Sequence, residues 1–412
     1  MTYYPETPKT TNRANHLCKV AHEFEKFIAK RGYSAPTICQ YRTSADALCA
    51  SLASAGNSIW ELTDELSKKL ITQLAEKASP RDRKHTKYRL ERFRDYLIEH
   101  ASAPPRAAPP IDMSSRACLR REYVAYLKEQ RGLSTSTIKH CLRFHDLFFT
   151  YMFGADLGNP NDIDPEDVTS FILERRGSAP RDKTIPSHLS NLFKFLFWSG
   201  CTKRDLSKSI PSIKQPKPTQ IPRYLPPDEV EQLLNAARNN IFTGRRNYAM
   251  LLMIARLGLR APEVVAIELD DIDWRSGEIL IRGKGQLHDR IPLPKDIGEA
   301  IVDYIRNDRR GSERSLFVSL RPPFKKFKDA QILRYILEDA YEATGIKPPQ
   351  SYIGSHILRH SLATNMLKNG ASLEEIGDIL RHRSPMATTI YAQHDIESLR
   401  GIARPWPAKG GV

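Results

Sequence analysis

Apolar residues recur at helical spacing along most of the chain, and one C-terminal stretch alternates instead. Helical periodicity predicts helices at 83–98, 185–198, 243–257, 296–306, 328–343, 354–368 and 372–381. By contrast, "GEILIRGKGQLHDRIPLP" at 277–294 contains two β-rich runs separated by Gly-Lys-Gly, which predicts a hairpin with Lys284 at or near its tip. The pattern therefore predicts a mainly α fold with a small antiparallel β-sheet or hairpin in the C-terminal part.

The first half of the chain contains an internal repeat with an offset of 100 residues. Its matches are "RGYSAPTI" at 31–38 with "RGLSTSTI" at 131–138, "PRD" at 80–82 with 180–182, and Phe93 with Phe193. Each copy shows an apolar helix, a glycine-containing turn and a second helix, which Ser34 can cap in the first copy. Because each copy also ends in a helix with one apolar face, we predict two similar helical units.

Two proline-rich stretches separate these units from each other and from the rest of the chain. They are "ASAPPRAAPP" at 101–110 and "SIPSIKQPKPTQIPRYLPP" at 209–227, which cannot be helical throughout. The predicted organisation is a helical unit at 1–100, a linker at 101–116, a second helical unit at 117–208, a linker at 209–225 and a C-terminal domain at 226–412.

Charge is distributed unevenly within a formal net charge of +15. Residues 1–225 hold 36 Lys and Arg against 24 Asp and Glu, which gives 36 − 24 = +12, whereas residues 226–412 hold 27 against 24, which gives +3. A basic half joined to a nearly neutral half predicts a polyanion-binding part and a part with another task. A basic surface that serves only solubility is the alternative. The closing helix of the first unit carries Arg83, Lys84, Lys87, Arg89, Arg92 and Arg94, either as a solvated face or as phosphate contacts.

The cysteine positions and the hydropathy disfavour several classes of protein. The six cysteines stand at 18, 39, 49, 118, 141 and 201, with no close pair. This spacing disfavours a disulfide framework or a cysteine zinc site and favours a reducing, cytoplasmic location. The chain has no run of 18 apolar residues, so we expect no membrane segment.

Four segments of the C-terminal domain carry polar residues that could do chemistry. They are "LGLRAPEVV" at 257–265 with Arg260 and Glu263, the hairpin with Lys284, "SHILRHSLAT" at 355–364 with His356 and Arg359, and "HRSPMATTIY" at 382–391 with His382 and Tyr391. Taken singly, they could be a surface ion pair, a solvated turn lysine, or a core tyrosine. His356 and His360 could be zinc ligands, but the glutamate of HExxH is missing.

In this order and at these separations, the four segments resemble the catalytic domain of the tyrosine recombinase (phage integrase) family over roughly 226–395. The resemblance implies six catalytic residues, namely Arg260, Lys284, His356, Arg359, His382 and Tyr391, with Tyr391 as the nucleophile. The same resemblance implies that Glu263 supports the site. It also implies that His356 accepts the proton of the tyrosine and that Lys284 donates a proton to the leaving oxygen. The two helical units resemble the family's DNA-binding core-binding domain, here duplicated.

The resemblance implies a site-specific DNA recombinase or integrase that cuts and rejoins DNA through a 3′-phosphotyrosyl intermediate, as in a mobile element. The implied partners are double-stranded DNA and other recombinase subunits in a homo- or hetero-tetramer on paired sites, without a membrane. No cofactor and no metal ion are expected, because two arginine forks can neutralise the charge that develops on the phosphate. The alternatives are a type IB topoisomerase and a catalytically weakened DNA-binding regulator.

The chain departs from the family pattern immediately before His382. Where the family commonly has Leu-Gly-His, this chain has Leu380-Arg381-His382. The replacement removes a permissive backbone position and adds a positive charge close to the expected phosphate. Ser384 and Pro385 then predict the start of a short helix that carries Tyr391.

Overall fold

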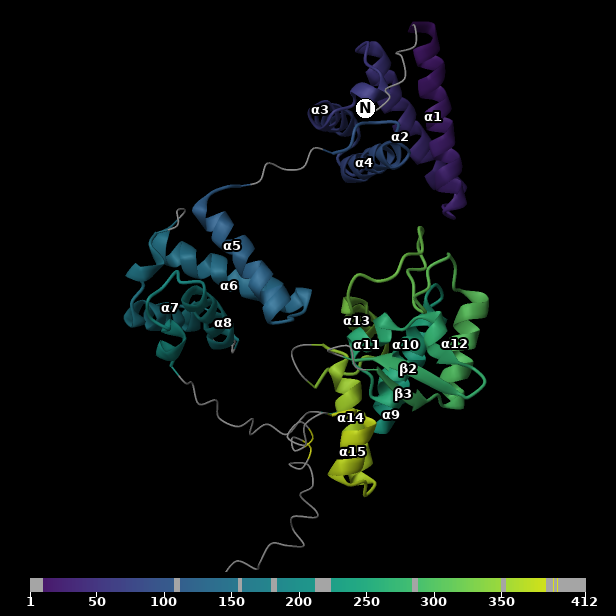
Figure 1. Ribbon diagram of the computed structural model, residues 1–412. Coiled ribbons are helices and arrows are strands. Elements are labelled where there is room, and N and C mark those ends of the chain that lie inside the picture. The colour runs from purple at the N-terminus through teal and green to yellow at the C-terminus, as the bar shows by residue number, and fades with distance from the viewer. Residues whose placement is uncertain are drawn as a thin grey trace, which may run out of the picture. The chain divides into compact units, whose positions relative to one another are not determined.

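The computed structural model describes most of the chain (Figure 1). The described residues are 10–106, 112–154, 158–178, 184–211, 224–283, 288–349 and 353–382, with Thr388 and Tyr391, and for 10–16 and 176–178 only the backbone is described. None of the helices in these ranges has the length and hydropathy to cross a bilayer. By compactness the chain divides into two units, one of them residues 107–217, and the remainder contains separate N-terminal and C-terminal hydrophobic cores.

The N-terminal part is a helical bundle. Its helices are α1 (Thr10–Lys30), α2 (Ala35–Ser54), α3 (Asp64–Lys77) and α4 (Arg83–Glu99), with a 3₁₀ turn at Ile59–Glu61. Phe24 and Ile28 are fully buried and lie one turn apart on α1, as the apolar periodicity predicts. The ring of Phe24 contacts that of Phe93 at a centroid distance of 4.8 Å, so the first and last helices share one core.

The second helical unit repeats this plan. It contains α5 (Ser115–Ala125) with a π-helical turn at Tyr126–Gln130, α6 (Thr135–Phe153), α7 (Pro165–Ser178) and α8 (Ile185–Trp198), and 3₁₀ turns at Pro160–Asp162 and Leu206–Ser209. Phe148 lies at its centre and meets the rings of Phe171 and Phe193 edge-on, at 5.2 and 5.1 Å. Each repeat therefore buries its matched phenylalanine, Phe93 or Phe193, in its closing helix.

The two repeats begin their second helix in nearly the same way. Ser34 and Ser134 occupy the N-cap positions of α2 and α6, and each hydroxyl lies 2.9 Å from the hydroxyl of the threonine three residues later. Ser134 also accepts a hydrogen bond from the helix amide of Thr137. Ser34 makes no such bond to a helix amide, so the expected capping interaction is present in the second repeat and absent in the first.

The C-terminal domain is mainly helical with one small sheet. Its elements are α9 (Pro227–Arg238), α10 (Gly244–Leu257), α11 (Ala261–Ala266), a 3₁₀ turn at Leu269–Asp271, β1 (Ile272–Asp273), β2 (Glu278–Arg282), β3 (His288–Pro292), α12 (Lys295–Asn307), α13 (Gln331–Thr344), α14 (His356–Lys368) and α15 (Leu373–Ile379). The three strands are antiparallel in the order β1-β2-β3, and Ile279 pairs with Ile291. The predicted hairpin is therefore present. Lys284, which was predicted at or near the hairpin tip, lies outside the described residues, as do Ser384 and Pro385.

Helix α10 forms the centre of this domain. Its five consecutive residues 250–254 are fully buried, so this helix is enclosed on all sides rather than amphipathic. Helices α9, α12, α13 and α14 all pack against it or against one another. A smaller cluster joins Ala363 of α14 to Ile376, Leu380 and Tyr391. One region of the domain is therefore enclosed by three helix ends. They are the end of α10, the start of α14 and the end of α15.

We expect Phe148→Ala to weaken the second helical unit and leave the C-terminal core intact, because the two cores are separate. Removing a fully buried ring costs about 3–5 kcal/mol. Amide hydrogen exchange on the full chain would then accelerate roughly a hundredfold in α6 and α8 but not in α10. Phe197→Ala, at a phenylalanine of α8 that is 47% exposed, is the control with little effect. Equal acceleration in α10 would contradict independent cores.

Candidate active site

Arg260 stands between a left-handed glycine and the start of α11. Gly258 ends α10 with a φ of 59°, and a Cβ at this position would lie 2.5 Å from Cδ2 of Leu380, so conformation and space both require glycine. Glu263 accepts hydrogen bonds from the backbone amide of Arg260 and from its Nη1, both at 2.8 Å. The side chain of Arg260 is 40% exposed, so it is held by Glu263 and still accessible to a ligand.

Glu263 is a buried carboxylate shared by two arginines. Its Oε2 accepts a further hydrogen bond from Nη2 of Arg381, also at 2.8 Å. Burial by itself would raise the pKa of Glu263, but the hydrogen bonds from Arg260 and the charge of Arg381 outweigh burial and lower the pKa below its usual value. An ionised carboxylate therefore joins the start of α11 to the residue after Leu380.

Arg359 lies on the first turn of α14 and is only 4% exposed. Its Nη1 donates to the carbonyl oxygen of Gly258, and its Nη2 donates to that of Leu380 at 2.6 Å. Burial, and after it the like charge of Arg260, lowers the pKa of Arg359 to about 10, so the guanidinium remains charged at neutral pH. Arg359 therefore connects the end of α10 to the end of α15 and leaves other N–H groups for a ligand.

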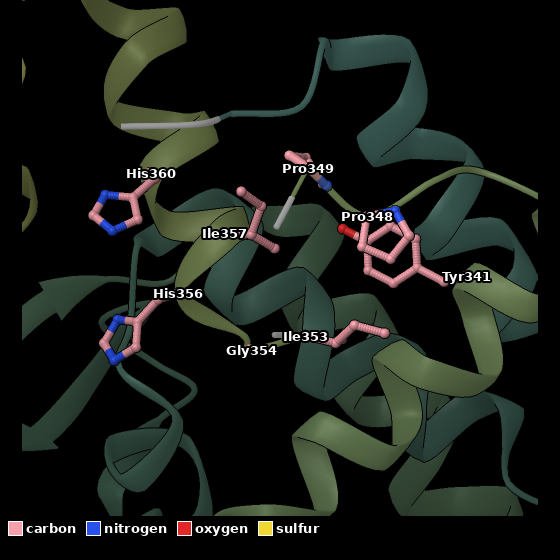
Figure 2. A pocket seen from close by; sticks show the side chains of 8 residues that line it. All are labelled: Tyr341, Pro348, Pro349, Ile353, Gly354, His356, Ile357 and His360. Atoms are coloured by element: carbon pink, nitrogen blue, oxygen red, sulfur yellow. The ribbon is translucent and has the colours of Figure 1, made fainter. Parts of the chain in front are cut away.

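His356 and His360 lie one turn apart on α14, with ring centroids 6.3 Å from each other. Figure 2 shows both imidazoles pointing to the same side of the helix. The two residues also contribute to the lining of a pocket with Tyr341, Ile353 and Ile357. Burial, and then the charge of Arg359, lowers the pKa of His356 below its usual value. Both rings are thus placed beside the arginines rather than in the hydrophobic core.

Tyr391 is 1% exposed, and its hydroxyl lies 2.8 Å from Nδ1 of His360. Burial raises the pKa of this tyrosine to about 12, while the charge of Arg359 opposes the rise. Sequence analysis assigned the tyrosine proton to His356, but the hydrogen-bonded histidine in the structure is His360. The difference arises because His360 lies one turn further along α14, where its ring centroid is 5.7 Å from that of Tyr391.

His382 lies directly beside the tyrosine. Its ring is nearly parallel to that of Tyr391, with centroids 6.5 Å apart, and its Nδ1 is 2.8 Å from the hydroxyl oxygen of Thr388. Burial, and then the charges of Arg359 and Arg260, lowers the pKa of His382 to about 4. The imidazole is therefore neutral at pH 7 in the free protein, because a further cation here would be repelled by both arginines.

The structure brings Arg260, His356, Arg359, His382 and Tyr391 into one region. The charge of Arg359 affects the pKa of His356, His382 and Tyr391, which shows that these groups surround it. Lys284 lies outside the described residues. Within the described part of the chain, no three His, Cys, Asp or Glu side chains are arranged to hold a metal ion, so the zinc alternative gains no support there.

Sequence reasoning missed two contacts of this site. His360 was considered only as a zinc ligand, and Thr388 was not considered at all. The signal for His360 was present in "HILRH", because a spacing of four places it on the same helix face as His356. Thr388 gave no comparable signal, since only the fold brings its hydroxyl to His382.

The low pKa of His382 predicts a pH-dependent contribution to stability. The unfolded chain, with a histidine pKa of about 6.5, binds a proton more readily than the folded protein between pH 6.5 and 4. This contribution is therefore present above about pH 6.5 and is lost as pH falls toward 4. Calorimetry at pH 7 and pH 5 measures the drop in unfolding temperature between the two pH values. This drop should be smaller for His382→Asn than for the wild type. His288→Asn, at an exposed histidine, is the control, and an unchanged pH dependence in His382→Asn would contradict the assignment.

Comparison with known proteins gives the family of the chain. Residues 223–398 match the phage integrase family. The chain is 37% identical over 290 residues, covering 70% of each protein, to the integrase/recombinase y4rA of Sinorhizobium fredii. It is 30% identical over 282 residues to the tyrosine recombinase XerD of Listeria monocytogenes, covering 66% of this chain and 93% of XerD.

Solved structures show the same fold. The XerH recombinase bound to its palindromic difH substrate matches with a TM-score of 0.55 and 18% identity, covering 73% of this chain and 100% of XerH. A lambda integrase dimer bound to a COC′ core site matches with a TM-score of 0.52 and 16% identity, covering 78% of this chain and 90% of that chain. The predicted fold class, mainly α with a small antiparallel sheet, is confirmed. The chain belongs to the phage integrase family, the tyrosine recombinases.

Proposed function

We propose that this recombinase cuts DNA at specific sites and rejoins the strands through a 3′-phosphotyrosyl intermediate on Tyr391. The observation that carries the proposal is the 2.8 Å hydrogen bond between the Tyr391 hydroxyl and Nδ1 of His360, beside Arg359. A tyrosine with a pKa near 12 is almost wholly protonated at neutral pH, so it needs an adjacent base to become a nucleophile. His360 supplies a base at hydrogen-bonding distance.

The proposed step balances without a further reactant. The Tyr391 oxygen bonds to phosphorus, the bond from phosphorus to the 5′ oxygen breaks, and the tyrosine proton passes to His360. Lys284 on the β2–β3 hairpin, the residue that matches the family's hairpin lysine, gives its proton to the leaving 5′ oxygen. Because the phosphotyrosyl bond is itself a phosphodiester, a 5′-hydroxyl from another strand can reverse the step and seal a new junction.

Arg260 and Arg359 stabilise the negative charge that grows on the non-bridging oxygens in this step. Arg260 is exposed enough to meet the phosphate, while Glu263 fixes one of its amino groups. Arg359 is fixed by two backbone carbonyl oxygens, so little reorganisation is needed when the phosphate arrives. Removing one such donor in other enzymes costs about 10²–10³ in rate, which is the size of contribution we assign to each arginine.

His382 and His356 are neutral hydrogen-bond donors to the same phosphate in this proposal. When Nδ1 of His382 accepts from the Thr388 hydroxyl, its Nε2 carries the proton and can donate to a phosphate oxygen. Both histidines have lowered pKa values, first because they are buried and then because the neighbouring arginines already supply positive charge. A bound phosphate would relieve that repulsion and raise both pKa values.

The two N-terminal repeats are proposed as DNA-binding units. Helix α4 presents Arg83, Lys84 and Lys87 to solvent, whereas Arg89 and Arg94 are buried and paired with Asp82 and Asp64 inside their own unit. We propose that the exposed cations contact phosphate, whereas Arg89 and Arg94 are held in internal ion pairs. We also propose the three-part organisation, with repeats at 1–100 and 117–208 and a catalytic domain at 226–412.

The wider setting is also part of the proposal. Double-stranded DNA is the partner, with four recombinase subunits, identical or mixed, assembled on paired sites of a mobile element. All six cysteines are free, which suits a reducing cytoplasm where DNA lies. The topoisomerase and regulator alternatives gain no support, because the relatives y4rA and XerD are named integrases and recombinases.

Tyr391→Phe should abolish the covalent protein–DNA adduct, because phenylalanine has no oxygen to bond to phosphorus. DNA affinity should change by no more than about threefold, since a single hydroxyl is removed. The assay is adduct formation on a nicked recombination site, read by denaturing electrophoresis. Tyr335→Phe, at a half-exposed tyrosine on α13, is the control and should form adduct normally. Adduct formation by Tyr391→Phe would assign the nucleophile elsewhere.

Replacing Arg83, Lys84 and Lys87 together by glutamine should weaken DNA binding. Each cation that no longer neutralises a phosphate lowers the slope of log affinity against log salt by about 0.9, so the slope should fall by up to about 2.7. A salt titration of the full chain measures this. The matched control replaces Lys68, Lys69 and Lys77 of α3, which removes the same charge. Equal effects in both triple variants would indicate a general charge effect rather than phosphate binding by α4.

A further inference from the structure

Arg381 has a backbone conformation that its residue type disfavours. It follows Leu380, the C-cap of α15, and has a φ of 52°, in the left-handed region where helix ends usually place glycine. An arginine keeps this conformation only where the surrounding structure compensates for the strain. The contacts of the Arg381 side chain can supply this compensation for the backbone strain.

Those contacts lie inside the active site. The side chain of Arg381 is only 10% exposed, and its Nη2 donates to Oε2 of Glu263 at 2.8 Å. Its Nε is 3.9 Å from Oδ2 of Asp289 on β3, a carboxylate that is half exposed. Its Nη1 is buried and has no hydrogen-bond partner among the described residues. Arg381 thus brings an incompletely neutralised positive charge to Glu263.

Glu263 forms an ion pair with Arg260. A second arginine on the same carboxylate changes the net charge of this group. One carboxylate and one guanidinium form a neutral pair, whereas one carboxylate between two guanidiniums leaves a net charge of +1. The Oε2 atom that accepts from Arg381 also accepts from the backbone amide of Arg260, and Oε1 accepts from Arg260 Nη1. The three side chains therefore form one hydrogen-bonded unit.

We propose that Arg381 is a positioning residue for DNA cleavage, which fixes Glu263 against Arg260 and preserves the positive charge of Arg260 for the phosphate. The inference rests on the proposed function and deepens it, because it assigns a role to a position where the sequence departs from the family's glycine. The same contact ties the residue before His382 to the start of α11, two segments 118 positions apart. Arg381 thereby sets the positions of Arg260 and His382 together.

The test is the single-turnover rate of adduct formation on a nicked site, measured with DNA affinity and thermal unfolding for each variant of the full chain. Arg381→Lys and Arg381→Met form the matched pair, since both share the strained backbone and only lysine keeps the charge. We expect Arg381→Met to slow cleavage by about 10–100-fold, as removal of a supporting hydrogen bond does in other active sites. Arg381→Lys should cleave about tenfold faster than Arg381→Met. The DNA affinity of both variants should differ from that of the wild type by less than about threefold.

Arg381→Gly separates strain from charge, because glycine accepts the positive φ and has no guanidinium. Arg381→Gly should cleave as slowly as Arg381→Met, even if its unfolding temperature is as high as that of the wild type. In a Glu263→Gln background the same substitution should slow cleavage by less than about threefold, since the group through which Arg381 acts is already removed. Arg245→Met is the control, because Arg245 also contacts two carboxylates, Asp303 and Asp308, on the surface of the same domain.

Three outcomes would overturn the inference. They are cleavage by Arg381→Gly within about twofold of the wild type, equal rates for Arg381→Lys and Arg381→Met, and an undiminished effect of Arg381→Gly in the Glu263→Gln background. These outcomes are distinct from failure of the proposed function. If the wild type itself formed no adduct on its site, the proposed function would fail before Arg381 was tested.

Discussion

The buried guanidinium of Arg359 is the interaction on which the site depends. It donates to the carbonyl oxygens of Gly258 and Leu380, which end α10 and α15, while its own backbone belongs to α14. Arg260 follows the first carbonyl by two residues, and Arg381 and His382 follow the second directly. A buried arginine must satisfy its donors. The contacts that hold the three helices together therefore also place Arg260, Arg381 and His382 near Arg359.

The electrostatic balance around Arg359 explains the states of its neighbours. Arg260, Arg359 and Arg381 bring three positive charges to one region, and Glu263 offsets one of them. Burial and then these charges lower the pKa of His356 and lower that of His382 to about 4, so the imidazole of His382 is neutral at pH 7. A site with surplus positive charge and neutral donors is incomplete until an anion enters it. In the proposed function, a bound phosphodiester relieves this repulsion, which contributes to binding and to transition-state stabilisation.

The sequence predicted well those features that local patterns control. Period-3.6 apolar positions gave the helices, the Gly-Lys-Gly turn between β-rich runs gave the β2–β3 hairpin, and the 100-residue offset gave two bundles with Phe93 and Phe193 in matching cores. The order of the arginine, histidine and tyrosine motifs gave the family. The helices and the hairpin depend on residues a few positions apart. The repeat and the order of the motifs are found by comparing stretches of sequence, so none of these features required a tertiary contact to be known.

What the sequence alone determined was thus the elements, the repeat and the family with its motif residues; the partners of those residues were decided only by the tertiary structure. His360 contacts Tyr391 across 31 positions and Arg381 contacts Glu263 across 118. Arg89 and Arg94 turn inward from α4, whose residues Arg83, Lys84 and Lys87 face solvent. Composition cannot separate a paired arginine from a free one, because pairing depends on which buried carboxylate the fold places nearby. At Arg381 the sequence showed the departure from glycine, and the structure supplied its physical reason, a carboxylate to hold.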